Sequence, residues 1–157
     1  MREISVQKIT ETVKKLCIEA ACNLTEDVEL LIKKGLEKEE SEFGRNILEQ
    51  ILENVRLSRE ENTAMCQDTG LAVIFLEIGQ DVHITGGSLT NAVNEGVRRG
   101  YQEGYLRKSA VDDPLFLRKN TGDNTPAIIH TEIVPGDKLK IMVVPKGAGQ
   151  RKFFVQL

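Results

Sequence analysis

Residues 65–76 read Met65-Cys66-Gln67-Asp68-Thr69-Gly70-Leu71-Ala72-Val73-Ile74-Phe75-Leu76. The first half places a thiol, an amide, a carboxylate and a hydroxyl in consecutive positions, and the second half is entirely apolar. The apolar residues continue to Ile78 and predict a buried strand that begins at Gly70. We expect the polar cluster at the mouth of this strand, where a rigid scaffold supports it and backbone groups can bind a ligand. The alternative is a turn with a buried cysteine, because cysteine often packs as a small apolar residue.

The composition restricts the classes of protein to consider. The 157 residues predict one domain, or one domain with an appended arm, and a hydrophobic fraction of 40% is enough for a core. A net charge of −3 gives no positive surface for nucleic acid or an anionic membrane. No apolar stretch approaches the ~20 residues that span a bilayer. Because the three cysteines are odd in number and the N-terminus lacks a signal peptide, we expect a reduced, cytoplasmic protein.

The first third of the chain has helical periodicity. Apolar residues recur at helical spacing from Ile4 to Asn23, and a second helix is expected after Thr25, which can cap it. A third helix is expected over residues 42–59. The apolar positions of the second and third helices are predicted to face inward; they are Val28, Leu31, Ile32, Leu36, Ile47, Leu48, Ile51, Leu52 and Val55.

A glycine-rich helix and further strands are expected after residue 78. Residues 82–84 can pair back onto the first strand. The helix predicted from Ser88 to Leu106 places small residues every four positions, and each interior glycine costs about 1 kcal/mol relative to alanine, so another element should pack very close to it. A long polar loop over residues 111–126 then precedes a predicted hairpin of two strands, over residues 127–134 and 139–144. The fold class expected is α+β, with N-terminal helices packed on a small mixed or antiparallel sheet.

Several polar residues favour structural roles. Cys17 and Cys22 lie about 140° apart around a helix, so they cannot easily share a metal ion and are expected in or near the core. His83 alternates with aliphatic residues and is expected to be exposed on a strand, and His130 is expected on a sheet face.

Two segments leave alternatives open. Arg107 falls at the end of the glycine-rich helix, where a cation suits the helix dipole. Arginine is also the side chain best shaped to bind a carboxylate through two parallel hydrogen bonds, and the residues alone do not separate these interpretations. Gly147 and Gly149 lie in a loop that suits close approach of a backbone to a ligand.

Five segments, taken together and in this order, resemble one protein family. They are Met65-Cys66-Gln67-Asp68-Thr69-Gly70, Arg107-Lys108-Ser109, Asp123-Asn124-Thr125-Pro126-Ala127, His130-Thr131-Glu132-Ile133-Val134-Pro135-Gly136-Asp137 and Lys146-Gly147-Ala148-Gly149. The family resembled is the iron–sulfur class I fumarase and L-tartrate dehydratase family, specifically its α subunit or N-terminal region. The resemblance implies a hydro-lyase that adds water to, or removes it from, a four-carbon dicarboxylate. It also implies a fumarase-type β subunit as partner, in a homo- or hetero-oligomer.

The resemblance further implies roles for individual residues. In that family three cysteines hold a [4Fe-4S] cluster whose fourth iron binds the substrate, and Cys66 matches the first ligand. Thiolates suit such clusters, and an open iron site acts as a Lewis acid. By the same resemblance Gln67 would bind the substrate carboxylate or hydroxyl, and Asp68 would be the acid or base for the water. Carboxylate binding is implied for Arg107, and backbone contact with the substrate for Gly147 or Gly149.

The chain departs from the family pattern in two respects. Cys66 is the one match among the three cluster cysteines, so this chain alone is expected to be inactive. After Gly149 the family continues Ser-Glu-Asn, whereas residues 150–157 read Gln-Arg-Lys-Phe-Phe-Val-Gln-Leu. Gln-Arg-Lys can be encoded CAG-CGA-AAA, which read one nucleotide later, with a following T, encodes Ser-Glu-Asn. We therefore interpret residues 1–149 as the N-terminal domain of an α subunit and hypothesise that residues 150–157 are a frameshifted tail.

Two other functions stay open alongside fumarate hydration. An L-tartrate dehydratase would use the same residues on a different dicarboxylate. A cluster-free module would bind a dicarboxylate, or would bind a partner subunit through the small-residue helix, without catalysis.

Overall fold

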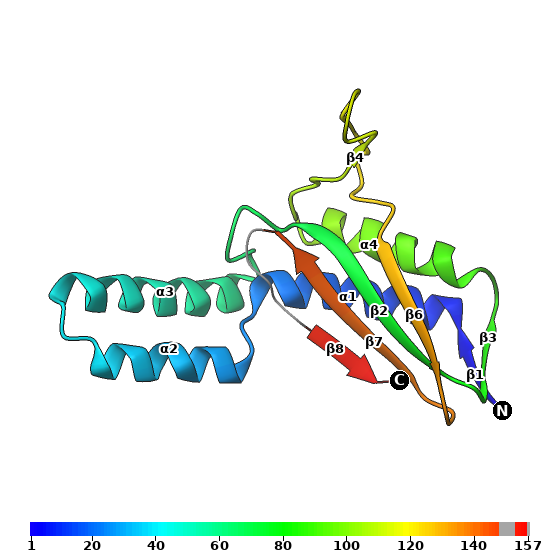
Figure 1. The fold of residues 1–157 in the computed structure, drawn as a ribbon, viewed down its shortest axis with the longest axis horizontal. Coiled ribbons are helices and arrows are strands. Elements are labelled where there is room, and N and C mark those ends of the chain that lie inside the picture. The colour runs from blue at the N-terminus through cyan, green and yellow to red at the C-terminus, as the bar shows by residue number, and fades with distance from the viewer. Residues whose placement is uncertain (148–152, 157) are drawn as a thin grey trace.

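In the part of the chain that the structure describes, helices combine with three small sheets, and the predicted α+β class is confirmed (Figure 1). A computed structural model describes residues 1–147 and the strand over residues 153–156. Its elements are β1 (Arg2–Ser5), α1 (Val6–Cys22), α2 (Glu26–Lys38), α3 (Glu42–Glu61), β2 (Leu71–Gly79), β3 (Val82–Thr85), α4 (Leu89–Glu103), β4 (Val111–Asp112), β5 (Lys119–Asn120), β6 (Ile128–Val134), β7 (Leu139–Lys146) and β8 (Phe153–Gln156). Within the described part of the chain, none of the helices is long and apolar enough to cross a bilayer.

The main sheet is mixed, with strand order β6-β2-β7-β8. β2 pairs parallel with β6 and antiparallel with β7, so the predicted hairpin of the last two strands is wrong: β2 lies between them. The cause lies in the connection from Val134 to Lys138, which passes under the end of β2. There the Gly79 amide donates to the Lys138 carbonyl at 2.8 Å, and the Gln80 amide donates to the Val134 carbonyl at 2.8 Å. These bonds let β6 and β7 flank β2 with a short turn.

The N-terminus also differs from the prediction. Residues 2–5 form β1 rather than the start of a helix, and Ser5 then caps α1 by accepting a hydrogen bond from the Lys8 amide at 3.3 Å. β3 does not pair back onto β2; it pairs parallel with β1 in a separate two-stranded sheet. Hydrophobic patterning indicates a strand but not its partner. The partner of β3 is β1, which lies eighty positions earlier in the sequence.

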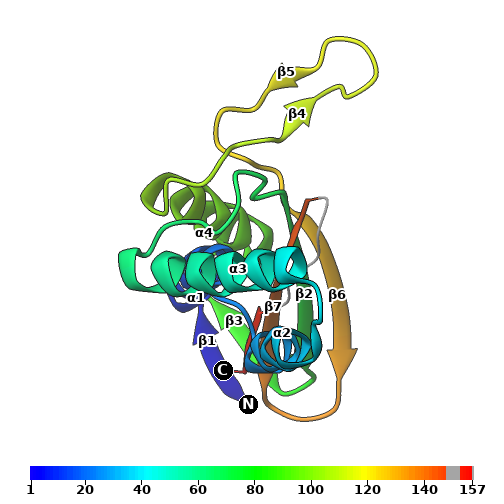
Figure 2. The same cartoon turned by 90° about the vertical axis from the view of Figure 1, so that its left-hand side faces the viewer.

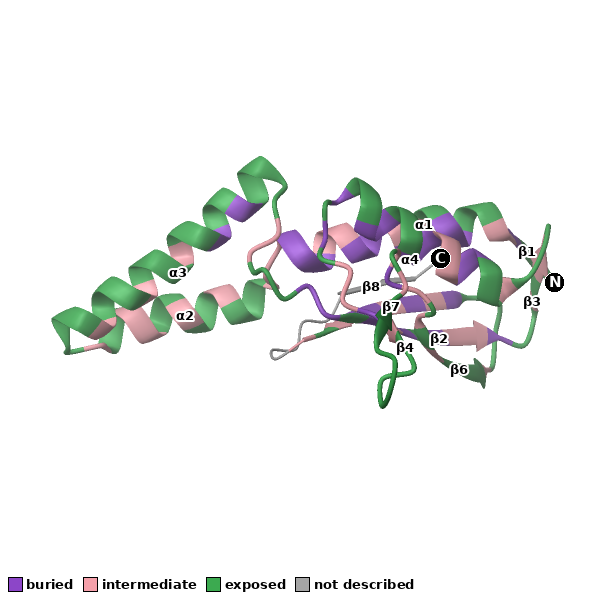
Figure 3. Cartoon of the chain, turned by 90° about the horizontal axis from the view of Figure 1, so that it is seen from above, coloured by how far each residue is buried: buried purple, intermediate pink, exposed green. Residues whose placement is uncertain are grey.

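The core lies between one face of the main sheet and the pair α1 and α4 (Figure 3). The predicted close approach at the small-residue helix is confirmed: a Cβ atom at Gly96 would lie 2.7 Å from the Thr10 carbonyl oxygen, and one at Gly100 would lie 2.8 Å from the Cys17 Cβ atom. The small-residue face of α4 is therefore occupied by α1 and is not a surface for a partner. Cys17 and Cys22 are buried, as predicted.

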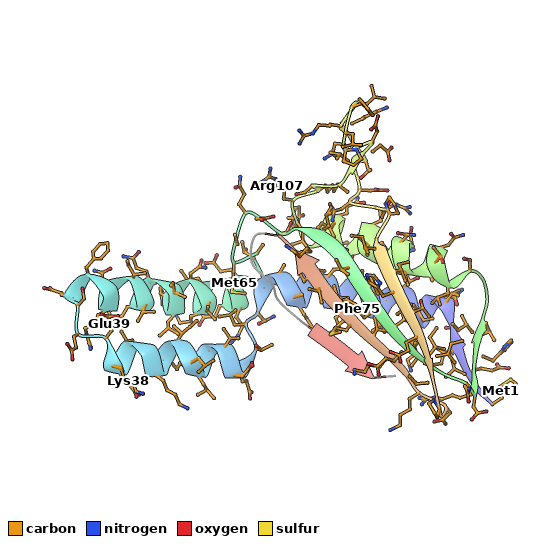
Figure 4. All side chains as sticks on the ribbon, viewed as in Figure 1. Met1, Lys38, Glu39, Met65, Phe75 and Arg107 are labelled. Carbon is orange, nitrogen blue, oxygen red and sulfur yellow. The ribbon has the colours of Figure 1, made fainter. Side chains whose placement is uncertain are left out.

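The other face of the main sheet carries no helix among the residues described. β2 is consequently half-buried rather than buried throughout: Ile74 is inaccessible, whereas Phe75 is 37% exposed. Phe75, labelled in Figure 4, lies on this open face. Its ring stacks on the His130 ring with centroids 4.9 Å apart, which supports the structural role predicted for His130.

The helices α2 and α3 form a hairpin that projects from the body of the molecule (Figures 1 and 2). α1 is thus the one N-terminal helix that lies on the sheet. α2 buries no residue, and α3 buries Val55 and Ser58, both near its attachment to the body. The prediction that these helices turn their apolar residues inward is therefore wrong for Val28, Leu31, Ile47 and Ile51, which are all exposed.

Candidate functional site

Four of the five segments singled out in the sequence converge at one end of the main sheet, where β2 begins and β7 ends. The segment over residues 130–137 instead runs along β6 to the opposite end. Leu71, the first residue of β2, pairs with Lys146, the last residue of β7. The loop over residues 62–70 enters β2 at this end, and the residues after α4 pass beside it. Figure 4 labels Met65 and Arg107 at this end of the sheet. Sequence segments up to about eighty residues apart therefore meet at one edge.

Two glycines, Gly70 and Gly147, allow the loop before β2 to pass over the end of β7 with the two backbones in direct contact. Gly70 has a φ of +69°, and a Cβ atom there would lie 2.6 Å from the Gly147 amide nitrogen. A Cβ atom at Gly147 would in turn lie 2.6 Å and 2.8 Å from the two carboxylate oxygens of Asp68. Any side chain at either position would push the strands apart or displace the carboxylate. The structure therefore brings Asp68 and Gly147 together.

Thr69 and Tyr101 tie this crossing to the end of α4. The Thr69 hydroxyl donates to the Arg107 carbonyl at 2.9 Å, and the Tyr101 hydroxyl lies 2.9 Å and 3.1 Å from the carbonyls of Thr69 and Gly70. Burial raises the pKa of the Tyr101 phenol, and the negative charge of Asp68 adds to the rise, so Tyr101 stays protonated as a donor. Arg107 and Asp68 thus belong to one connected set of loops.

Asn124 fixes the long polar loop to the same place. Its side-chain oxygen accepts from the amides of Ser109 and Ala110 at 2.7 Å and 2.9 Å, and its side-chain nitrogen donates to the Gly70 carbonyl at 3.2 Å. The residue has a positive φ of 63° and is 1% exposed. One buried amide therefore joins the segments around Gly70, Ser109 and Asn124.

The neighbouring Asp123 connects this loop to α4. Its carboxylate lies 3.0 Å from the Arg98 Nε and accepts from the Thr125 hydroxyl at 2.7 Å. Burial acts to raise its pKa, but the bonds from Thr125 and Arg98 outweigh burial and hold the pKa of the Asp123 carboxyl below its usual value. Asp123 therefore stays charged and anchors the loop.

Three of the predicted site residues point to the surface from this scaffold. Cys66, Gln67 and Arg107 are exposed. Within the described residues, the Arg107 guanidinium makes no ion pair with a carboxylate, so its fork of donors faces solvent. Gly149 and residues 150–152 and 157 lie outside the described residues, and residues 153–156 add β8 to the edge of β7.

The described residues do not fit an iron–sulfur cluster by themselves. A cluster needs several thiolates around one position, and Cys66 is the one exposed cysteine. Cys17 and Cys22 are buried in the core, and burial raises the pKa of the Cys17 thiol to about 12, which disfavours a thiolate. No group of three potential metal ligands occurs among these residues.

A cavity of about 410 Å³ lies elsewhere, beside the start of α4. It is bordered by Gly86 and Gly87, but also by Glu11 and Glu95, which pair with Arg99 at 3.2 Å and 2.6 Å. Because these carboxylates already pair with the arginine, the cavity does not favour an anion, and the two glycines form the bend before α4.

Comparison with known proteins decides the family. The family model described as fumarate hydratase (Fumerase) matches residues 10–153. The chain belongs to the fumarate hydratase (Fumerase) family. It is 35% identical over 147 residues to a Methanocaldococcus jannaschii protein named "Putative L(+)-tartrate dehydratase subunit alpha", covering 90% of this chain and 51% of that protein.

Two Escherichia coli members of the family extend the comparison. The class I anaerobic fumarate hydratase of strain K12 is 38% identical over 114 residues, which is 71% of this chain and 20% of that enzyme. The L(+)-tartrate dehydratase subunit alpha of strain UTI89 is 27% identical over 150 residues, which is 94% of this chain and 49% of that subunit. The chain spans about half the length of the tartrate dehydratase subunits it matches.

Sequence reasoning missed two buried residues that support the site without facing solvent. Asn124 and Tyr101 were assigned no role. A signal existed for Asn124, because an asparagine in a turn-rich segment before Thr-Pro suits a positive φ. Nothing in the local sequence indicated that Tyr101 reaches the entry of β2.

Proposed function

We propose that this chain supplies the N-terminal part of the substrate site of a hydro-lyase that interconverts fumarate and (S)-malate by reversible hydration. The observation that carries the proposal is the contact of Gly147 with the Asp68 carboxylate, at the edge where Thr69 also holds the Arg107 backbone. Family membership supports the same class of reaction, since the named relatives are fumarate hydratases and tartrate dehydratase subunits.

The exposed side chains suit the parts of such a reaction. Arg107 would bind one substrate carboxylate through two parallel hydrogen bonds. Gln67 would bind a carboxylate or hydroxyl oxygen, and the backbone of Gly147 or Gly149 would contact the substrate. Hydration places the hydroxyl of water on one carbon of the double bond and a proton on the other. Asp68 would take or return the proton of that water as general base or acid.

A complete enzyme would need residues beyond this chain. We propose that Cys66 is one ligand of an iron–sulfur cluster whose other thiolates lie outside the described residues, so that the chain alone is inactive. Residues 1–149 would then be the N-terminal domain of an α subunit, and residues 150–157 an atypical tail. The relatives named subunit alpha imply a β subunit as partner. A thiolate ligand of this kind also fits a reducing, cytoplasmic location.

Two alternatives use the same site. L-Tartrate is the other four-carbon dicarboxylate to which the relatives' names point. A cluster-free module that binds a dicarboxylate without catalysis is favoured by one observation: Cys66 is the single exposed thiol. Anaerobic reconstitution with iron and sulfide, in the presence of a β-type subunit, separates the two functions. Brown protein with labile sulfide supports the enzyme, and a colourless complex supports the module.

Isothermal titration of the chain with (S)-malate, fumarate and L-tartrate tests the shared substrate site. We predict binding that Arg107→Ala weakens by about 10- to 100-fold, because a charge-assisted hydrogen bond contributes roughly 1.5–3 kcal/mol. Arg2→Ala is the matched control, since Arg2 is an exposed arginine on the separate β1–β3 sheet. No dicarboxylate binding, or equal losses in both variants, would contradict the proposal.

A further inference from the structure

Thr69 connects the two segments that are proposed to bind substrate, and it does so from inside the molecule. Its residue is 6% exposed, whereas the neighbouring Asp68 and the more distant Arg107 face solvent. A threonine buried beneath exposed polar residues does not reach a dissolved ligand. Its contribution to the site is therefore the placement of the residues around it.

The backbone of Thr69 shapes the turn that presents Asp68. Its amide donates to the Gln67 carbonyl at 3.1 Å, which closes a three-residue turn with Asp68 at the apex. The Thr69 carbonyl in turn accepts from the Tyr101 hydroxyl at 2.9 Å, so the turn is fixed to α4. Asp68 thus has a defined position relative to Thr69.

The side chain of Thr69 holds Arg107. Its hydroxyl donates to the Arg107 carbonyl at 2.9 Å, across 38 positions of sequence. The next peptide group is held separately, since the Asn120 side-chain nitrogen donates to the Lys108 carbonyl at 2.8 Å. Loss of the Thr69 hydroxyl would therefore free the peptide group of Arg107 and leave the following part of the loop in place.

We propose that Thr69 is a positioning residue, which holds Asp68 and Arg107 at a fixed separation so that both meet one dicarboxylate. The inference rests on the proposed function and adds to it a residue that does not touch the substrate. A group that is held in place before binding loses less freedom when the ligand arrives, and the affinity is higher for that reason. The Thr69 hydroxyl thus raises substrate affinity through Arg107.

Two substitutions separate the hydrogen bond from packing at this position. Thr69→Val keeps the branched shape of the side chain but removes the donor to the Arg107 carbonyl. Thr69→Ser keeps the donor and removes a methyl group. If the hydroxyl positions Arg107, the serine variant should bind substrate better than the valine variant.

Thr10 provides a matched control elsewhere in the fold. It is 7% exposed, and its hydroxyl donates to the Ala92 carbonyl at 3.0 Å, so it also joins two elements through one hydrogen bond. Ala92 lies near the start of α4, whereas Arg107 follows the end of that helix. Thr10→Val should therefore lower the midpoint of urea unfolding as much as Thr69→Val does, without changing the site.

Isothermal titration of the full chain with (S)-malate tests the inference. We predict that Thr69→Val weakens binding about three- to tenfold, because Arg107 must then be ordered during binding. Thr69→Ser should restore most of the affinity, and Thr10→Val should bind as the unchanged chain does. Urea unfolding of the same samples verifies that each variant is folded under the conditions of the titration.

A double-mutant cycle with Arg107→Ala shows whether Thr69 acts through Arg107. Once the guanidinium is removed, Thr69→Val should cause no further loss, because the segment that it holds no longer binds the ligand. Additive losses, full affinity in Thr69→Val, or an equal loss in Thr10→Val would overturn the inference and leave the proposed function standing. No binding of (S)-malate by the unchanged chain, or no loss in Arg107→Ala, would overturn both.

Discussion

At the scale of single residues, the site depends on side chains that never face a ligand. Asn124 satisfies two amides and one carbonyl from segments that are otherwise joined by few bonds. A buried polar group that loses its partner costs about 1–3 kcal/mol. The hydrogen bonds of this one side-chain amide therefore contribute as much to the free energy of unfolding as a larger packing contact.

Replacing this amide should therefore be costly. We predict that Asn124→Ala lowers the free energy of unfolding by about 3 kcal/mol, since the amides of Ser109 and Ala110 lose their acceptor and the Gly70 carbonyl loses one of its two donors. Asn46→Ala is the control, because Asn46 is exposed on α3 and bonds only to Gln50 among the residues described. Its effect should stay within about 0.5 kcal/mol. Urea unfolding measures both, and similar values for the two variants would contradict the role of Asn124.

The same scale shows what the sequence can and cannot predict. The burial of Cys17 and Cys22 followed from helical spacing, which is a local property. The surface position of Cys66 and Arg107 is compatible with the family resemblance. The bonds of Tyr101 and Asn124 join residues 31 and 54 positions away, so no local pattern could indicate them.

At the scale of elements, the pairing of α1 with α4 rests on glycine. The backbone of α1 leaves no room for a side chain at Gly96, because an added Cβ atom would lie 2.7 Å from the Thr10 carbonyl oxygen. Gly35 in α2 is open by comparison, since its nearest neighbour to such an atom is the Leu48 Cδ1 at 3.9 Å. A substitution at Gly96 changes both packing and helix propensity, whereas one at Gly35 changes mainly helix propensity.

Alanine should consequently have opposite effects at the two glycines. Gly96→Ala should lower the free energy of unfolding by about 2 kcal/mol, because overpacking outweighs the better helix propensity of alanine. Gly35→Ala should raise it by up to about 1 kcal/mol. Chemical denaturation at equal protein concentration provides the comparison. Stabilisation by Gly96→Ala would mean that α1 and α4 are not in close contact.

The positions of the helices and strands were easier to predict than the elements against which each of them pairs or packs. Periodicity located each helix within a few residues, and the requirement for a close partner of α4 was correct. The pairing of β6 with β7 was predicted wrongly, because a short turn between two strands usually makes a hairpin and β2 takes the place between them. The inward orientation of α2 and α3 failed for a related reason: an apolar face predicts burial, not whether the same chain supplies the cover.

At the scale of the whole molecule, one end of the sheet collects four of the five segments that resemble the fumarase family, and the segment over residues 130–137 runs along β6 to the opposite end. Their order along the chain was visible in the sequence, whereas their convergence required the crossing of Gly70 over the end of β7. The same scale explains why the chain is expected to be inactive alone. Under the proposed function, one exposed thiol and an Arg107 without an ion pair among the residues described would form part of a site whose remaining groups come from elsewhere.

The most direct test of this account is an amide nuclear magnetic resonance titration of the chain with (S)-malate and L-tartrate. If the converging segments form one dicarboxylate site, the resonances of Gln67 to Gly70, Arg107 to Ala110 and Gly147 should shift together with a common dissociation constant. The turn from Pro135 to Lys138, at the opposite end of the sheet, should stay unchanged. Shifts confined to that turn, or none at saturating dicarboxylate, would contradict the central claim.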